Sequence, residues 1–304
     1  MKCAILISTC DRYVPLAQFT ARLIDAYWVP HPPILFCGLS DLNGQPGFRS
    51  GSRDQSDWVG ITQDAVSGLR QKGFDAAYLI LEDHPPFGLC HADHLNSTLP
   101  QLMENLGAAY ISLYGWDQRT RSSGEILGRQ FHGLQRQSED FDWRFSLHPG
   151  LWNLEALAAI LAALPPMEGD GRSRLPWAFE RRSGAADFPM PPQWRNRSYR
   201  IQSLSMLAGG NAPARGWERR LEFRAIDALR WMVRTAGGES ALQRLDARLA
   251  PVLRFHDGPY PLFWSGLLRK GAWNPDAEKF LRWRGRRDFF RRWTELKAEW
   301  RVPP

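Results

Sequence analysis

Two adjacent acids and a histidine, Glu82-Asp83-His84, follow the apolar run at 78–81 directly, and two prolines come next. Adjacent carboxylates at the end of a buried strand repel each other unless water or a cation surrounds them. The pair has three interpretations: the solvated start of a loop, a catalytic carboxylate dyad, or ligands of a divalent cation that bridges a diphosphate. Mg²⁺ and Mn²⁺ suit the third interpretation because they take hard oxygen ligands.

The elements that must position these acids alternate between strand and helix patterns. Short apolar runs predict strands buried on both faces, and apolar residues three or four apart predict helices. Strands are expected at 3–9, 33–41, 76–84 and 108–116, and helices at 14–28, 57–73 and 92–107. Asp57 is the expected N-cap of the second helix and Gly73 its C′ residue. The alternation predicts an α/β layered fold with a largely parallel sheet.

Polar residues follow the predicted strands at what would be one edge of the sheet. Thr9, Asp11 and Arg12 come after the first strand, and Asp41 comes after the second. Ligands of such sheets bind beyond the carboxyl ends of the strands. We therefore expect a nucleotide site here, in which Asp41 binds a ribose hydroxyl. Turn capping is the alternative role for each of these side chains.

The chain is basic, with 39 Lys+Arg against 32 Asp+Glu and a net charge of +7 over 304 residues. Positive charge suits phosphate-bearing partners, namely nucleotides, nucleic acid or an anionic membrane surface. The four cysteines form no Cys-x-x-Cys pair, and the first residues lack the apolar length of a signal peptide. No apolar run reaches the roughly 18 residues of a membrane span. A reduced, cytoplasmic protein is expected.

Four segments together resemble bacterial glycosyltransferases of the GT-A type, which use nucleotide sugars and carry an Asp-x-Asp-like motif at a strand end. They are ISTCDRY (7–13), YLILEDHPPF (78–87), FSLHPGLWNLEALAAIL (145–161) and PWAFE (176–180). The last two resemble a polysaccharide-assembly subgroup, and GNAPARGWERR (210–220) is a weaker match. The strict motif is Asp-x-Asp, whereas this chain has Glu82-Asp83-His84. Arginine could then screen the diphosphate in place of a metal.

The resemblance implies a GT-A-like, Rossmann-type nucleotide-sugar-binding and catalytic core at 1–220, followed by a basic helical region at 221–304. Glu180 is the expected catalytic base. Asp83 is the expected catalytic and metal-binding carboxylate, with Glu82 as the second ligand of Mg²⁺ or Mn²⁺. The ordinary alternatives are that Glu180 is a salt-bridged surface residue, and that Glu82 and Asp83 form a hydrogen-bonded strand terminus.

The same resemblance implies that the nucleotide sugar contacts Glu82, His84, His148 and Trp152, beside Thr9, Asp11, Arg12 and Asp41. His148 could instead be a buried, hydrogen-bonded histidine, and Trp152 a core residue. The cluster His84, Cys90, His91 and His94 has zinc-binding residue types, but its spacing matches no tetrahedral site that geometry supports.

The stretch at 280–301 contains eight cations and three acids. Phe289, Trp293, Leu296 and Trp300 fall on one helical face. This helix would either lie on an anionic bilayer at the inner membrane face or pack on the core with its arginines in water. Arginine interleaved with tryptophan also suits nucleic acid, but the acidic strand end would repel a phosphate backbone.

The resemblance implies a glycosyltransferase that moves a sugar from a nucleoside-diphosphate sugar to a glycan or lipid-linked acceptor. The alternatives are a non-catalytic relative that binds nucleotide or glycan, and a basic nucleic-acid-binding protein.

Overall fold

The predicted strands and helices of the first 112 residues are present in the computed structural model. The strands are β1 (Cys3–Ser8), β2 (Ile34–Leu39), β4 (Ala76–Leu81) and β5 (Tyr110–Ser112), and the helices are α1 (Val14–Tyr27), α2 (Trp58–Gln71) and α3 (Leu99–Leu106). The structure describes residues 1–50, 54–114, 134–137, 139, 144–165, 174–201, 225, 228–229, 231–238, 240–242, 244–245, 255–256, 258–263, 265–269, 271–284 and 287–302.

Local capping places α2 as predicted. Asp57 Oδ1 accepts a hydrogen bond of 2.9 Å from the Gly60 backbone N–H, which satisfies a donor in the first turn. Gly73 follows the helix with a φ of 74°, the left-handed conformation that glycine adopts at a helix end.

In the described residues one sheet has the strand order β3-β2-β1-β4-β7-β5-β8-β6. Its further strands are β3 (Gly47–Arg49), β6 (Leu134–Arg136), β7 (Gly150–Asn153) and β8 (Ser198–Ile201). β1 is parallel to β2 and β4, and β5 is parallel to β8. β7 is antiparallel to both of its neighbours, and β6 is antiparallel to β8. The α/β fold with a parallel-dominated central sheet is confirmed.

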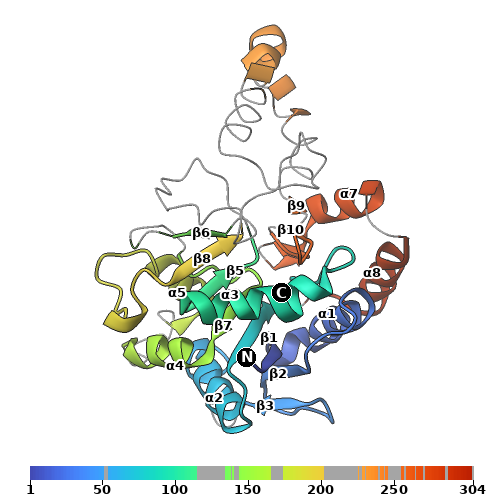
Figure 1. The fold of residues 1–304 in the computed structure, drawn as a ribbon. Helices are drawn as coiled ribbons and strands as arrows, with labels where there is room; N and C mark the ends of the chain where they lie inside the picture. The colour runs from blue at the N-terminus through green and yellow to red at the C-terminus, as the bar shows by residue number, and fades with distance from the viewer. Residues whose placement is uncertain are drawn as a thin grey trace.

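Helices cover both faces of this sheet (Figure 1). Leu6 and Leu79 belong to the core cluster under α2, α4 (Leu154–Ala163) and α5 (Pro176–Arg182). Tyr78 and Ile80 belong to the cluster on the other face, under α1 and α3. Alternate side chains of a strand point to opposite faces, so a continuous apolar run is what a strand covered on both faces requires.

The C-terminal region packs against this core. It contains the hairpins β9 (Phe255–His256) with β10 (Leu262–Phe263) and β11 (Leu268–Arg269) with β12 (Ala272–Trp273), followed by α7 (Pro275–Arg284) and α8 (Arg287–Glu299). The expected helical region is thus present, together with short strands. The boundary predicted at 220/221 lies outside the described residues.

The apolar face of α8 is buried against α1, and Figure 1 shows the two helices side by side. The Phe289 ring lies 5.8 Å from that of Phe19 and 5.0 Å from that of Phe87. Trp293 and Leu296 are also buried. Of the two alternatives expected for this helix, the structure shows packing on the core, because core side chains cover its apolar face. Among the described residues, no helix combines the length and apolar character needed to cross a membrane.

Candidate active site

The strand order brings three distant segments to one edge of the sheet. β1 and β4 run parallel, so Ser8 lies beside Leu81 at their carboxyl ends. β7 runs the other way and begins with Gly150 opposite Leu79. The residues before β7, 146–149, therefore reach the edge at which β1 and β4 end.

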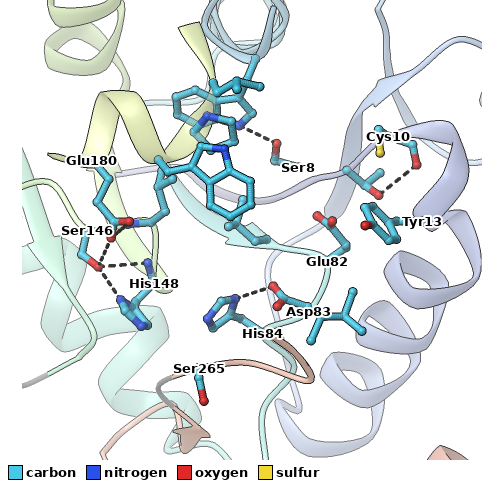
Figure 2. Close-up of a pocket in the computed structure, with 18 of the residues that line it drawn as sticks. Ser8, Cys10, Tyr13, Glu82, Asp83, His84, Ser146, His148, Glu180 and Ser265 are labelled. Atoms are coloured by element: carbon cyan, nitrogen blue, oxygen red, sulfur yellow. Dashed lines mark hydrogen bonds and ion pairs between the residues drawn. The ribbon is translucent and has the colours of Figure 1, made fainter. Parts of the chain in front are cut away.

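A cleft of about 440 Å³ opens at this edge, and Figure 2 shows its main side chains. Its walls also include Trp177 from α5 and Ser265 from the C-terminal region. The sequence-predicted residues that line the cleft are Thr9, Arg12, Glu82, Asp83, His84, His148 and Glu180. The structure therefore brings together the acidic motif, defined here as residues 82–84, and the proposed base.

Other segments hold the backbone of the acidic motif. The Glu82 carbonyl accepts a hydrogen bond of 2.5 Å from the Thr20 hydroxyl. The Asp83 carbonyl accepts one of 2.8 Å from the Leu267 backbone N–H, and the His84 carbonyl accepts one of 2.9 Å from the Tyr260 hydroxyl. Two of these donors come from the C-terminal region. The acidic motif is therefore fixed from both sides.

The two carboxylates differ in their surroundings. Asp83 Oδ1 lies 2.8 Å from His84 Nδ1, and 17% of the Asp83 side chain is exposed. Burial, followed by the charge of Asp83, raises the pKa of Glu82 to about 8. Burial thus favours the protonated form of Glu82, and a bound cation would favour its ionised form.

Glu180 lies across the cleft from the acidic motif, at the end of PWAFE on α5. Its Oε1 accepts hydrogen bonds of 3.0 Å each from the Ser146 hydroxyl and the Leu147 backbone N–H. Burial raises the pKa of Glu180, while these two bonds and the charge of His84 act in the opposite direction. In the described part of the chain, Oε2 carries no hydrogen bond. A half-buried carboxylate of raised pKa is suited to take a proton.

Two histidine rings lie between the carboxylate groups (Figure 2). The rings of His84 and His148 meet edge to face, with centroids 5.3 Å apart. Tyr114 stacks on the His148 ring at 4.8 Å, and His148 Nδ1 lies 2.5 Å from the Ser146 hydroxyl oxygen. His148 thus joins the hydrogen-bonded group that contains Glu180.

Three predicted residues do not line the cleft. Trp152 is 1% exposed and packs against Tyr110 and Phe145, so its predicted contact with a sugar is wrong. Asp41 is exposed and accepts a hydrogen bond from the Asn43 backbone N–H, which is the capping alternative. Asp11 accepts two hydrogen bonds from Ser40 and joins the ends of β1 and β2 instead of facing the cleft.

Sequence reasoning missed several lining residues, among them Tyr13, Gln55, Ser112, Tyr114, Ser146, Trp177, Arg200 and Ser265. Ser112 and Arg200 are each 2% exposed and lie within strands. Arg200 donates hydrogen bonds of 3.1 and 2.8 Å to Gln135 Oε1. Polar residues on a buried strand face are unusual, and this was the signal that could have identified them.

The residues of the acidic motif fit a Mg²⁺- or Mn²⁺-type site. Such ions are commonly held by one or two carboxylates together with substrate phosphates and water. Glu82 and Asp83 both line the cleft, and burial followed by the charge of Asp83 raises the pKa of Glu82. Within the described residues, no group of three or more His, Cys, Asp or Glu side chains is arranged around a common point, so the remaining ligands would come from the substrate and water.

No family model matches the chain, and no curated protein matches it. Several solved structures match the chain at low identity and low TM-score. The A197 protein from STIV has a TM-score of 0.32 and 14% identity, over 66% of this chain and 82% of that one.

Two other matched structures have similarly low scores. A cytidylyltransferase from Leptospira borgpetersenii serovar Hardjo-bovis has a TM-score of 0.34 and 13% identity, over 65% of this chain and 79% of that one. The TarS 1–349 structure from S. aureus has a TM-score of 0.34 and 8% identity, over 72% of this chain and 68% of that one. Function is therefore inferred from the residues of the cleft.

Proposed function

We propose that this protein is a glycosyltransferase that moves a sugar from a nucleoside-diphosphate sugar to a hydroxyl of a glycan or lipid-linked acceptor. The observation that supports this proposal is that Glu180 and the acidic motif, remote in sequence, line one cleft at the carboxyl edge of the sheet. One side of the cleft can take a proton, and the other can hold a diphosphate through a cation.

The proposed base is Glu180. Its Oε2 takes the proton of the acceptor hydroxyl while the acceptor oxygen forms a bond to the anomeric carbon of the donor. The bond from that carbon to the diphosphate oxygen breaks, and the electron pair leaves with the diphosphate. Like glycoside hydrolysis, this transfer passes through an oxocarbenium-like state.

The diphosphate would lie at the acidic motif. Glu82 and Asp83 would hold a divalent cation, which supplies positive charge to the leaving phosphate oxygens. Arg12 lines the same cleft, with its guanidinium 4.8 Å from the centre of the Tyr13 ring. Its charge would add to the screening of the diphosphate. Thr9 and Arg12 line the cleft at the end of β1 and would contact the nucleotide there.

Nucleotide binding provides the first test of this proposal. We expect thermal stabilisation by one nucleoside diphosphate of a panel of UDP, GDP, CDP and ADP, and a larger stabilisation when Mn²⁺ is present. Stabilisation by oligonucleotides alone would instead indicate a nucleic-acid-binding protein.

Turnover provides the second test. Hydrolysis of the matching sugar donor should fall by about 100-fold or more in Asp83→Asn, which weakens diphosphate stabilisation. Glu180→Gln should lower transfer to an acceptor by a similar factor, because a general base contributes about 100-fold or more. Nucleotide binding without turnover in the wild-type protein would identify a non-catalytic relative.

A further inference from the structure

A turn in the C-terminal region contacts Asp83. The Gly266 backbone N–H donates to the Phe263 carbonyl at 2.9 Å, and the next residue, Leu267, donates its N–H to the Asp83 carbonyl at 2.8 Å. The turn lies beside His84 in Figure 2, where Ser265 marks it. A segment far along the chain therefore binds the backbone of Asp83, whose carboxylate is proposed to hold the diphosphate.

Asn274 shapes this turn from within the core. Its side chain is fully buried and donates to the Ser265 hydroxyl at 2.7 Å and to the Gly266 carbonyl at 2.9 Å. Its backbone N–H donates to the Leu267 carbonyl at 2.9 Å. A buried amide with these partners fixes the turn, since breaking a buried hydrogen bond leaves a polar group unsatisfied.

Glycine at position 266 leaves room for the Asp83 carboxylate. Gly266 has a φ of 63°, and a Cβ built there would lie 2.5 Å from Asp83 Oδ2 and 2.8 Å from the Asp83 carbonyl oxygen. Both distances are shorter than a carbon–oxygen contact, so any side chain at 266 would displace Asp83. The Asp83 carboxylate can therefore keep its observed position only because residue 266 has no side chain.

We propose that Gly266 is a positioning residue of the active centre: the turn at 265–267, held by Asn274, sets where the Asp83 carboxylate meets a cation-bound nucleoside diphosphate. This inference rests on the proposed function and extends it, because it makes the C-terminal region a wall of the catalytic cleft. A displacement of about 1 Å in such a group is enough to cost two orders of magnitude in rate.

The test compares two left-handed glycines. Gly266→Ala should lower donor hydrolysis by about 100-fold and raise the Mn²⁺ concentration for half-maximal turnover by about tenfold, as expected for a misplaced ligand. Gly73→Ala is the matched control. Gly73 has a φ of 74° and no atom within 4 Å of a built Cβ, so its substitution should lower the Tm through backbone strain alone and leave both kinetic values unchanged.

A double-mutant cycle shows whether the effect passes through Asp83. Once Asp83→Ala has removed the carboxylate, adding Gly266→Ala should change the affinity for the nucleoside diphosphate by less than about twofold. If Gly266→Ala alone folds poorly, Asp83→Ala should restore part of its Tm, because the clash with the carboxylate is relieved while the one with the Asp83 carbonyl oxygen remains.

Equal losses from Gly266→Ala in the two backgrounds, or an unchanged Mn²⁺ response, would overturn the positioning role. So would a failure of Asp83→Ala to restore any Tm to a poorly folded Gly266→Ala protein. A wild-type protein that neither binds nor turns over nucleoside-diphosphate sugars would overturn the proposed function itself, together with this inference. The two failures are therefore distinguishable by the behaviour of the wild-type protein.

Discussion

The Ser146 hydroxyl donates a hydrogen bond of 3.0 Å to Glu180 Oε1, and the same hydroxyl oxygen accepts one of 3.2 Å from the His148 backbone N–H. Ser146 therefore connects the turn before β7 to the carboxylate on α5. Together with the Leu147 N–H, which also reaches Oε1 at 3.0 Å, it orients Glu180 so that Oε2 is the remaining oxygen for an acceptor proton. The two hydrogen bonds favour the ionised form of Glu180, whereas burial favours its protonated form.

Replacing Ser146 should change the pH dependence of transfer. The base must be ionised, so activity rises with pH through the raised pKa of Glu180. Ser146→Ala removes one donor to the charged form and should move the acid limb of the kcat/KM profile upward by about one pH unit. Ser146→Thr keeps the hydroxyl and should restore the wild-type profile. An unshifted limb in Ser146→Ala would show that Ser146 has no part in setting the base.

Glu82 should make the folded protein less stable as the pH rises. Its pKa is about 8 in the folded state, above the ordinary value near 4.5, so the folded protein binds the proton more tightly. The free energy of unfolding should therefore fall between about pH 4.5 and 8, by on the order of 5 kcal/mol for this group. Urea unfolding at several pH values measures it.

The control for this pH dependence is Glu82→Gln, which has no titrating carboxyl group. Its unfolding free energy should fall less steeply over the same range, and added Mn²⁺ should flatten the wild-type curve by favouring the ionised form of Glu82. The same slope in the wild-type and Glu82→Gln proteins would assign the effect to other groups.

Sequence reasoning predicted the parts of the fold that depend on neighbouring residues. The apolar run before Glu82 is long enough for one strand, and it became β4. Asp57 caps the start of α2 and Gly73 follows its end. Both were predictable because capping depends on only a few adjacent residues. The acidic motif was placed correctly at the cleft for the same reason: its position follows from the end of β4 alone.

The rest of the site depends on pairings that no local pattern contains. β7 lies between β4 and β5, and Ser146 and His148, which precede β7, therefore lie near the acidic motif. The position of β7 in the sheet is set by contacts between residues far apart in the sequence. Trp152 was wrongly assigned a contact with the sugar because its side chain packs against Tyr110 of the neighbouring strand, a contact that the sequence does not reveal. The contact of Gly266 with Asp83 is likewise invisible in a periodicity analysis.

The exposed indole of Trp177 should affect the acceptor and leave the donor unaffected. Trp177 is 65% exposed, lines the cleft and lies one helical turn before Glu180. A flat aromatic surface beside the base suits the apolar face of a sugar. Trp177→Ala should lower transfer to a glycan acceptor by about tenfold, or ~1.4 kcal/mol, with donor hydrolysis and Tm unchanged. Trp177→Phe should retain most of the transfer. An equal loss of donor hydrolysis would place Trp177 on the donor side instead.

The buried face of α8 should contribute to folding, because Phe289 contacts α1 and Phe87 instead of facing outward. Phe289→Ala removes a fully buried ring and should lower the free energy of unfolding by about 3–5 kcal/mol. Arg291→Ala, on the exposed side of the same helix, should change it by less than about 0.5 kcal/mol. Urea denaturation measures both, and co-sedimentation with phosphatidylserine vesicles provides the contrasting readout. A stable Phe289→Ala protein that loses vesicle binding would show that this face meets a bilayer, against the packing described here.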